Sequence, residues 1–295
     1  SDNNITDKVN RKNIAVITTY VDAYIFPQMI QHVERVLSNA GYTVQISFTY
    51  NRISREKSIL EGIVAKDDIA GVIAEPTKSS LPNPNLKYYE KLRKKHVPVL
   101  FMNTYYEALD APHVSMDDIM AGKIATQYVI GKGHKRIGGV FKLDDSQGSR
   151  RYFGFLEAMN EASLRVTGND LLWFDTVDIE NEENVRQLAE RIRKRLSTRT
   201  ALVLYNDESA YKLINEFNKM GLKIPDDISI VGIDDTVLST NGTVQITSVA
   251  YPTEEIAVKA ANNLLELIKN GRFDATYEFS VHIVERDSVK DLTDN

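Results

Sequence analysis

The stretch GLKIPDDISIVGIDD, residues 221–235, is the part of the sequence that decides the class of fold. It begins with a glycine suited to the end of a helix, and Pro225 followed by aspartate favours a tight turn. Residues 228–233 form a short, mostly β-branched apolar run, which is typical of a parallel strand buried on both faces. Two carboxylates, Asp234 and Asp235, end the run. Because ligands of open α/β sheets bind beyond the carboxyl ends of strands, these two residues are expected at a binding site.

The composition limits which classes of protein and of functional site are possible. The chain has 295 residues, which is enough for two α/β domains of ordinary size, and its 42% hydrophobic and 26% charged residues are typical of a globular protein. It has no cysteine, which excludes disulfides, thiolate metal sites and a cysteine nucleophile and fits the reducing cytoplasm, the location we expect. The net charge of −5 argues against tight nucleic-acid binding by this chain alone. No apolar run reaches the roughly 20 residues of a membrane helix, so we expect no membrane partner.

Apolar runs alternate with helical periodicity along the whole sequence after a polar, unpatterned segment at residues 1–12, which predicts a linker. Strands are expected at residues 14–18, 44–48, 71–75, 98–103, 137–141, 171–174, 201–205, 228–233 and 279–284. Helices are expected at residues 27–39, from 54 onward, and at 119–130, 152–162, 183–196, 208–219 and 254–269. Repeated β-α units of this length predict parallel sheets with helices on both faces. The fold class is therefore α/β, with two doubly wound parallel-sheet subdomains and a ligand cleft between them.

The opening stretch resembles the GL-x-IP-x-DIS-(V/I)-VG-(F/Y/I)-DD signature of the LacI/GalR family of sugar-responsive repressors. Further matches follow the order of that family's motifs: VSMDD at 114–118, GHKRI at 133–137, Arg151 with Gly154 and Phe155, NDESA at 206–210, ITSV at 246–249 before Pro252, and ERDS at 285–288. In the first of these, Asp118 stands where asparagine is usual. The resemblance covers nearly the whole chain from Asn13 onward.

The resemblance implies a periplasmic-binding-protein-like fold of type I, in which the chain crosses between subdomains three times. We place the crossings near Ser115, Val249 and Ser280. The N-terminal subdomain would then comprise residues 13–115 plus 250–279. The C-terminal subdomain would comprise residues 116–249 plus 280–295.

Polar and aromatic side chains at the expected strand ends are suited to a sugar. Carboxylate, amide and guanidinium groups engage neighbouring hydroxyls in pairs, while aromatic faces cover the apolar face of a sugar ring. The candidate ligand-binding residues are Tyr20, Asp22, Tyr24, Phe26, Glu75, Asn103, Arg151, Asn206, Asp234 and Tyr251. By resemblance, Asn103, Arg151, Asn206 and Asp234 fall on the family's effector-contacting positions.

Several of these candidates have structural alternatives. Arg151 could begin a helix and pair with an acid, and Asn206 could cap the helix expected from residue 208. Phe26 could belong to the core as readily as to a site. Glu75 could equally be a structural residue that does not contact ligand.

Enzyme motifs are not found in the sequence. Residues 131–133, Gly-Lys-Gly, lack the third glycine of a dinucleotide-binding loop and follow a helix rather than a strand. The chain also lacks a P-loop, a G-x-S-x-G elbow and an H-E-x-x-H motif, and its five histidines do not have metal-ligand spacing. The paired aspartates at residues 117–118, 144–145 and 234–235 could serve acid–base chemistry, but nothing supplies a nucleophile or metal beside them. We therefore expect no enzyme activity, no cofactor and no metal.

The sequence favours the sugar-sensing, homodimerising module of a bacterial transcription repressor. Within the family, the chain resembles the arabinose-utilisation repressors, which join a GntR-type winged-helix head to a LacI/GalR-type body. That resemblance implies that L-arabinose is the effector and that operator DNA binds only through an N-terminal head absent here. Sugar binding would release the operator.

The alternative is an exported solute-binding protein that delivers a sugar to a transporter. It shares the same architecture, but exported binders of this kind are usually monomers. A sedimentation mass therefore distinguishes the two.

Overall fold

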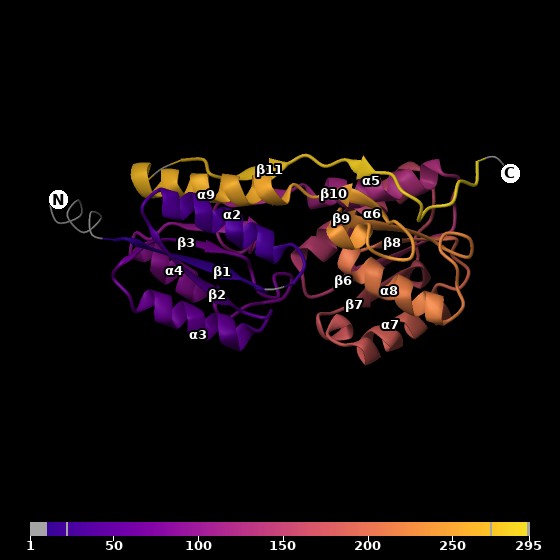
Figure 1. Ribbon diagram of the computed structural model, residues 1–295, viewed down its shortest axis with the longest axis horizontal. Helices are drawn as coiled ribbons and strands as arrows, with labels where there is room; N and C mark the ends of the chain where they lie inside the picture. The colour runs from indigo at the N-terminus through magenta and orange to yellow at the C-terminus, as the bar shows by residue number, and fades with distance from the viewer. Residues whose placement is uncertain (1–10, 22, 272, 294–295) are drawn as a thin grey trace. The chain divides into compact units, whose positions relative to one another are not determined.

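The computed structural model describes residues 11–21, 23–271 and 273–293 (Figure 1). The chain forms two compact units. Unit 1 comprises the chain up to Met116 together with Pro252–Phe279, and unit 2 comprises Asp117–Tyr251 together with the chain from Ser280 onward. These boundaries differ from the expected ones by one or two residues: Met116 lies in unit 1, and Ala250 and Tyr251 lie in unit 2, because Ala250 pairs with Asp234 of that unit.

Unit 1 contains a six-stranded sheet in the order β11-β5-β4-β3-β1-β2, in which every pair of neighbouring strands is parallel. Its strands are β1 Asn13–Thr18, β2 Thr43–Phe48, β3 Ile69–Ala74, β4 Val99–Asn103, β5 His113–Met116 and β11 Tyr277–Phe279. Its helices are α2 Phe26–Asn39, α3 Ile53–Val64, α4 Leu86–Lys94 and α9 Thr253–Asn270. Helices α2 and α9 pack together on one face of the sheet, and α3 and α4 cover the other (Figure 1).

Unit 2 contains a second six-stranded sheet in the order β12-β10-β9-β8-β6-β7. Its strands are β6 Ile137–Lys142, β7 Leu171–Phe174, β8 Ala201–Leu204, β9 Ser229–Asp234, β10 Thr247–Ala250 and β12 Ile283–Val284. Its helices are α5 Asp118–Gly131, α6 Ser146–Glu161, α7 Glu182–Arg195 and α8 Asp207–Lys219, with three short 3-10 turns, η1 Gly168–Asp170, η2 Val177–Ile179 and η3 Val237–Ser239. Only β12 runs antiparallel to its neighbour among the described pairs of this sheet.

The stretch that decided the fold class forms the elements that it predicts. Helix α8 ends before Gly221, which has a φ of 80°, and every residue of β9 is buried. Such burial requires an apolar strand covered on both faces. The prediction of an α/β fold with two doubly wound sheets is confirmed.

Two predictions of local structure are wrong, and three elements were not predicted. The strand expected at residues 279–284 is two short strands, β11 and β12, which belong to different sheets. The helix expected from residue 152 begins at Ser146, where Asp145 caps it by accepting a hydrogen bond from the Gln147 amide at 3.0 Å. Strands β5 and β10 and helix α4 were not predicted, because elements of four and nine residues leave few positions in which a periodic pattern can be read.

Among the residues that the structure describes, no helix is both long enough and apolar enough to cross a membrane.

Candidate functional site

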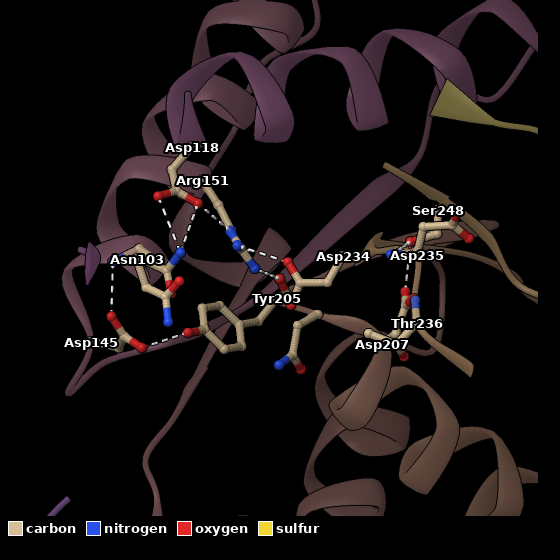
Figure 2. Close-up of polar contacts among 12 residues, drawn as sticks. Asn103, Asp118, Asp145, Arg151, Tyr205, Asp207, Asp234, Asp235, Thr236 and Ser248 are labelled. Carbon is tan, nitrogen blue, oxygen red and sulfur yellow. Dashed lines mark hydrogen bonds and ion pairs between the residues drawn. The ribbon is translucent and has the colours of Figure 1, made fainter. Parts of the chain in front are cut away.

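Arg151 is the centre of the candidate site in unit 2. Its side chain is 1% exposed, although arginine is rarely buried without partners. Nε donates to Oδ1 of Asp118 at 2.9 Å, and Nη2 donates to Oδ1 of Asp234 at 2.9 Å. Nη1 donates to the carbonyl oxygen of Tyr205 at 2.7 Å. Figure 2 shows the two carboxylates on opposite sides of the guanidinium, so one cation is shared between two buried acids.

A second layer of side chains fixes this group. The guanidinium carbon of Arg151 lies 5.0 Å from the centroid of the Tyr205 ring, within the range of a cation–π interaction. The Tyr205 hydroxyl donates to Asp145 at 2.6 Å (Figure 2). Gln147 Nε2 donates to both oxygens of Asp118 at 3.2 Å. The ring and the carboxylates are therefore held from several elements of the same unit.

Two glycines allow helices α5 and α6 to approach closely enough to form the Asp118–Arg151 pair. A Cβ atom on Gly122 would lie 2.0 Å from the carbonyl oxygen of Arg151. A Cβ atom on Gly154 would lie 1.9 Å from the carbonyl oxygen of Ile119. Both distances are far below contact, so the helix crossing requires glycine on each side.

Burial changes the proton affinity of this cluster. The pKa of Asp118 is raised to about 6, chiefly because burial disfavours the charged form, and Arg151 opposes that effect. Burial likewise raises the pKa of Asp207, a neighbouring carboxylate that is fully buried at the start of α8.

We expect Asp118→Asn to remove part of the pH dependence of unfolding. The folded chain binds the Asp118 proton more tightly than the unfolded chain does, so this residue's contribution to stability falls as pH rises from about 4 to about 6. Relative to the variant, the wild type should therefore lose unfolding free energy across that window. Denaturant titrations at pH 4.5, 5.5 and 7 measure the difference. A difference that is constant with pH would show that Asp118 stays ionised throughout.

Asn206 acts as a helix cap in the structure. Its side chain accepts a hydrogen bond from the Ser209 amide at 3.0 Å, while the Asn206 amide donates to the Ser209 hydroxyl at 3.3 Å. The capping alternative is thus what the structure shows. Asn206 also follows Tyr205 directly, which places it at the carboxyl end of β8 beside the arginine cluster.

In unit 1, the candidate residues Glu75 and Asn103 contact each other. Glu75 follows β3 and is 7% exposed; its Oε2 accepts from the Thr19 amide at 3.0 Å and its Oε1 accepts from Asn103 Nδ2 at 3.4 Å. Asn103, at the end of β4, has a φ of 71°, which is uncommon for a residue other than glycine. Local strain of this kind is frequent at functional sites.

Aromatic candidates of unit 1 follow Thr19, the residue whose amide donates to Glu75. The Tyr20 ring lies 5.8 Å from Phe26 and 6.2 Å from Tyr50, measured between centroids. Phe26 is buried at the first residue of α2 and contributes to the core as well. Tyr24 has a φ of 63°. Tyr251 is buried in unit 2, and Asp22 lies outside the described residues.

The structure adds residues that sequence reasoning did not select. Asp118, Gln147, Tyr205 and Asp145 all contact the arginine cluster. Asp118 stands where the resembling family usually has asparagine. A carboxylate buried at that position needs a cation beside it, so this difference could have indicated the pair with Arg151. No comparable signal identifies Gln147, because the predicted helix began after it.

No group of three or more histidine, cysteine, aspartate or glutamate side chains in the described part of the chain is arranged to hold a metal ion.

Comparison with known proteins gives a consistent result. Residues 126–289 match the family described as periplasmic binding protein-like domain. An arabinose metabolism transcriptional repressor of Halalkalibacterium halodurans is 36% identical over 277 residues, 94% of this chain and 73% of that protein. A protein of the same name from Geobacillus stearothermophilus is 36% identical over 290 residues, 97% of this chain and 79% of the relative.

Among solved structures, the transcription regulator CcpA of Lactococcus lactis has the same fold, with a TM-score of 0.83, 22% identity and coverage of 95% of this chain and 99% of that one. The curated relatives carry the names of repressors, not of enzymes. The chain belongs to the periplasmic-binding-protein-like family, as an effector-binding domain of the LacI/GalR type.

Proposed function

We propose that the chain is the sugar-binding module of a bacterial transcriptional repressor and that its effector is L-arabinose. The observation that carries the proposal is the buried cluster of Arg151, Asp118 and Asp234 at the carboxyl end of the unit 2 sheet. Two relatives that are 36% identical over nearly the whole chain and are named as arabinose metabolism repressors support the choice of sugar.

The chemistry of the candidate residues suits a neutral polyol. A guanidinium donates in a planar fork, and a carboxylate accepts from two neighbouring hydroxyls, so Arg151 and Asp234 together match the alternating donors and acceptors of a sugar. Within unit 1, the Glu75 carboxylate and the Asn103 amide are an acceptor and a donor of the same kind. The charged groups are already ordered by their partners before any ligand binds, which lowers the cost of binding.

The proposed partners follow from the same assignment. A second copy of this chain is the proposed dimer partner, and operator DNA would bind through a domain outside this chain. Arabinose would release the operator by binding the DNA-free state more tightly than the DNA-bound state, since a ligand shifts an equilibrium only through its differential affinity. The names of the relatives favour this function over delivery of a sugar to a transporter in the cell envelope.

A thermal-shift panel of L-arabinose, D-xylose, D-ribose, D-galactose and D-glucose tests the proposal. A ligand that binds only the folded state stabilises it by about 2.7 kcal/mol at a concentration one hundred times its dissociation constant. We therefore expect arabinose to raise the melting temperature by about 4 °C, and more than the other sugars. If only a hexose raised it, the chain would be a sugar sensor with a different effector. If none of the sugars did, the assignment of a free sugar effector would be wrong.

A further inference from the structure

The turn that carries Asp234 has an unusual backbone. Asp234 has a φ of 107° and Asp235 a φ of 47°, both in the left-handed region that favours glycine. Two successive residues of this kind persist only where surrounding contacts hold them. Because Asp234 is the carboxylate that binds Arg151, whatever holds this turn also sets the direction of a group at the candidate site.

Asp207 holds the backbone of the turn. Its Oδ2 accepts from the Thr236 amide at 3.0 Å, and its Oδ1 accepts from the Ser248 hydroxyl at 2.7 Å. The oxygen of that hydroxyl accepts in turn from the Asp235 amide at 3.0 Å (Figure 2). Asp207 thus fixes both peptide groups that follow Asp234. A Cβ on Gly232 would lie 2.2 Å from Oδ1 of Asp207, so the glycine of β9 leaves the space for this carboxylate.

Arg286 holds the Asp235 side chain of the turn. It comes from the segment after β12, far from the turn in sequence, and its Nη2 donates to Oδ1 of Asp235 at 2.6 Å. Its Nη1 donates to the carbonyl oxygen of Ile246 at 2.9 Å, and its amide donates to the Thr247 hydroxyl at 2.9 Å. The Arg286 side chain is 16% exposed and that of Asp235 is 24% exposed, so the pair is largely shielded from water.

We propose that Asp207 and Arg286 are positioning residues for ligand recognition, which act through the Asp235–Thr236 turn to aim the Asp234 carboxylate at Arg151. Neither contacts Arg151 in a hydrogen bond of the described structure; the effect passes through Asp234. The inference rests on the proposed function for its ligand, but the geometry of the turn is independent of which sugar binds.

The test compares Arg286→Met with Lys132→Met. Lys132 pairs with Glu285 at 2.9 Å and Asp291 at 3.3 Å, so its substitution also removes ion pairs to the same C-terminal segment but leaves the Asp235 turn intact. Calorimetric titration with L-arabinose should give a dissociation constant about tenfold higher for Arg286→Met, within the usual range of coupled contacts, and an unchanged one for Lys132→Met. Arg286→Lys should recover part of the affinity, since lysine reaches Asp235 as a point charge but lacks the planar fork.

A double-mutant cycle distinguishes positioning from a general loss of structure. In an Asp234→Asn background the Arg286→Met effect should largely disappear, because the group being aimed has lost its charge. The same loss of affinity in both backgrounds would overturn the proposal, as would a folded Arg286→Met variant that binds like wild type. If Arg286→Met does not fold, Ser248→Ala is measured in its place. This variant removes the link between the Asp235 amide and Asp207, so it should also weaken arabinose binding about tenfold. Wild-type affinity in a folded Ser248→Ala variant would overturn the proposal.

Hydrogen exchange without sugar supplies a readout independent of the proposed function. Arg286→Met should increase amide exchange at residues 235 and 236, and Lys132→Met should not. If the wild-type chain binds no sugar, the proposed function fails, and the exchange measurement still decides whether Arg286 holds the Asp235–Thr236 turn. Unchanged exchange at the turn would overturn it.

Discussion

Replacing Arg151 with methionine is expected to destabilise unit 2 by about 3–5 kcal/mol. The substitution removes the cation shared by Asp118 and Asp234 and leaves both carboxylates buried, with side-chain exposures of 1% and 5%. Methionine fills much of the arginine's volume, so the loss comes mainly from uncompensated charge rather than from a cavity. Trp173, the only tryptophan of the chain, lies in unit 2 and its fluorescence reports the unfolding of that unit.

Arg186→Met is the matched control. Arg186 also pairs with two acids, Glu183 at 2.6 Å and Glu190 at 2.5 Å, but its side chain is 46% exposed on α7. Exposed pairs contribute about 0–1 kcal/mol, so this variant should unfold nearly as the wild type does. Equal effects of the two substitutions in urea titrations would mean that the buried cluster is not stabilised by Arg151.

Gly122→Ala should lower stability by about 1–3 kcal/mol or more, because its Cβ would lie 2.0 Å from a backbone oxygen that cannot rotate away. Helix α5 would have to move from α6, which separates Asp118 from Arg151. We therefore expect the variant to lose sugar affinity together with stability. Both quantities are measured by denaturant titration and calorimetry on the same preparation.

Gly131→Ala provides the control within the same helix. Apart from its sequence neighbours and the backbone of its own helix, nothing lies within 4 Å of a Cβ built at Gly131, so alanine there should be neutral or should stabilise the helix by up to about 1 kcal/mol. If Gly122→Ala were as stable as Gly131→Ala, the close helix crossing would be wrong.

The sequence predicts most of the fold because its strands are short, apolar and separated by clear helical periodicity. Residues 228–233 illustrate this, since only a strand covered on both faces tolerates such a run. The wrong predictions occur where the structure of a segment depends on which strands it pairs with. Residues 279–284 read as one strand, yet β11 pairs with β5 and β12 pairs with β10 in different units.

The candidate site was predictable in part for a related reason. Strand ends indicated Asp234, Glu75 and Asn103, and resemblance indicated Arg151. The partners of these residues were not predictable, because Asp118 reaches Arg151 only through the packing of α5 on α6. The support from Arg286 depends on a contact between positions 235 and 286, which no local pattern reveals.

Calorimetric titration of L-arabinose into the wild-type chain tests the central claim most directly, with D-glucose titrated as the comparison sugar. We expect saturable binding of one arabinose per chain and markedly weaker heat from glucose. An absence of saturable heat from arabinose, with the chain shown by circular dichroism to be folded, would contradict it.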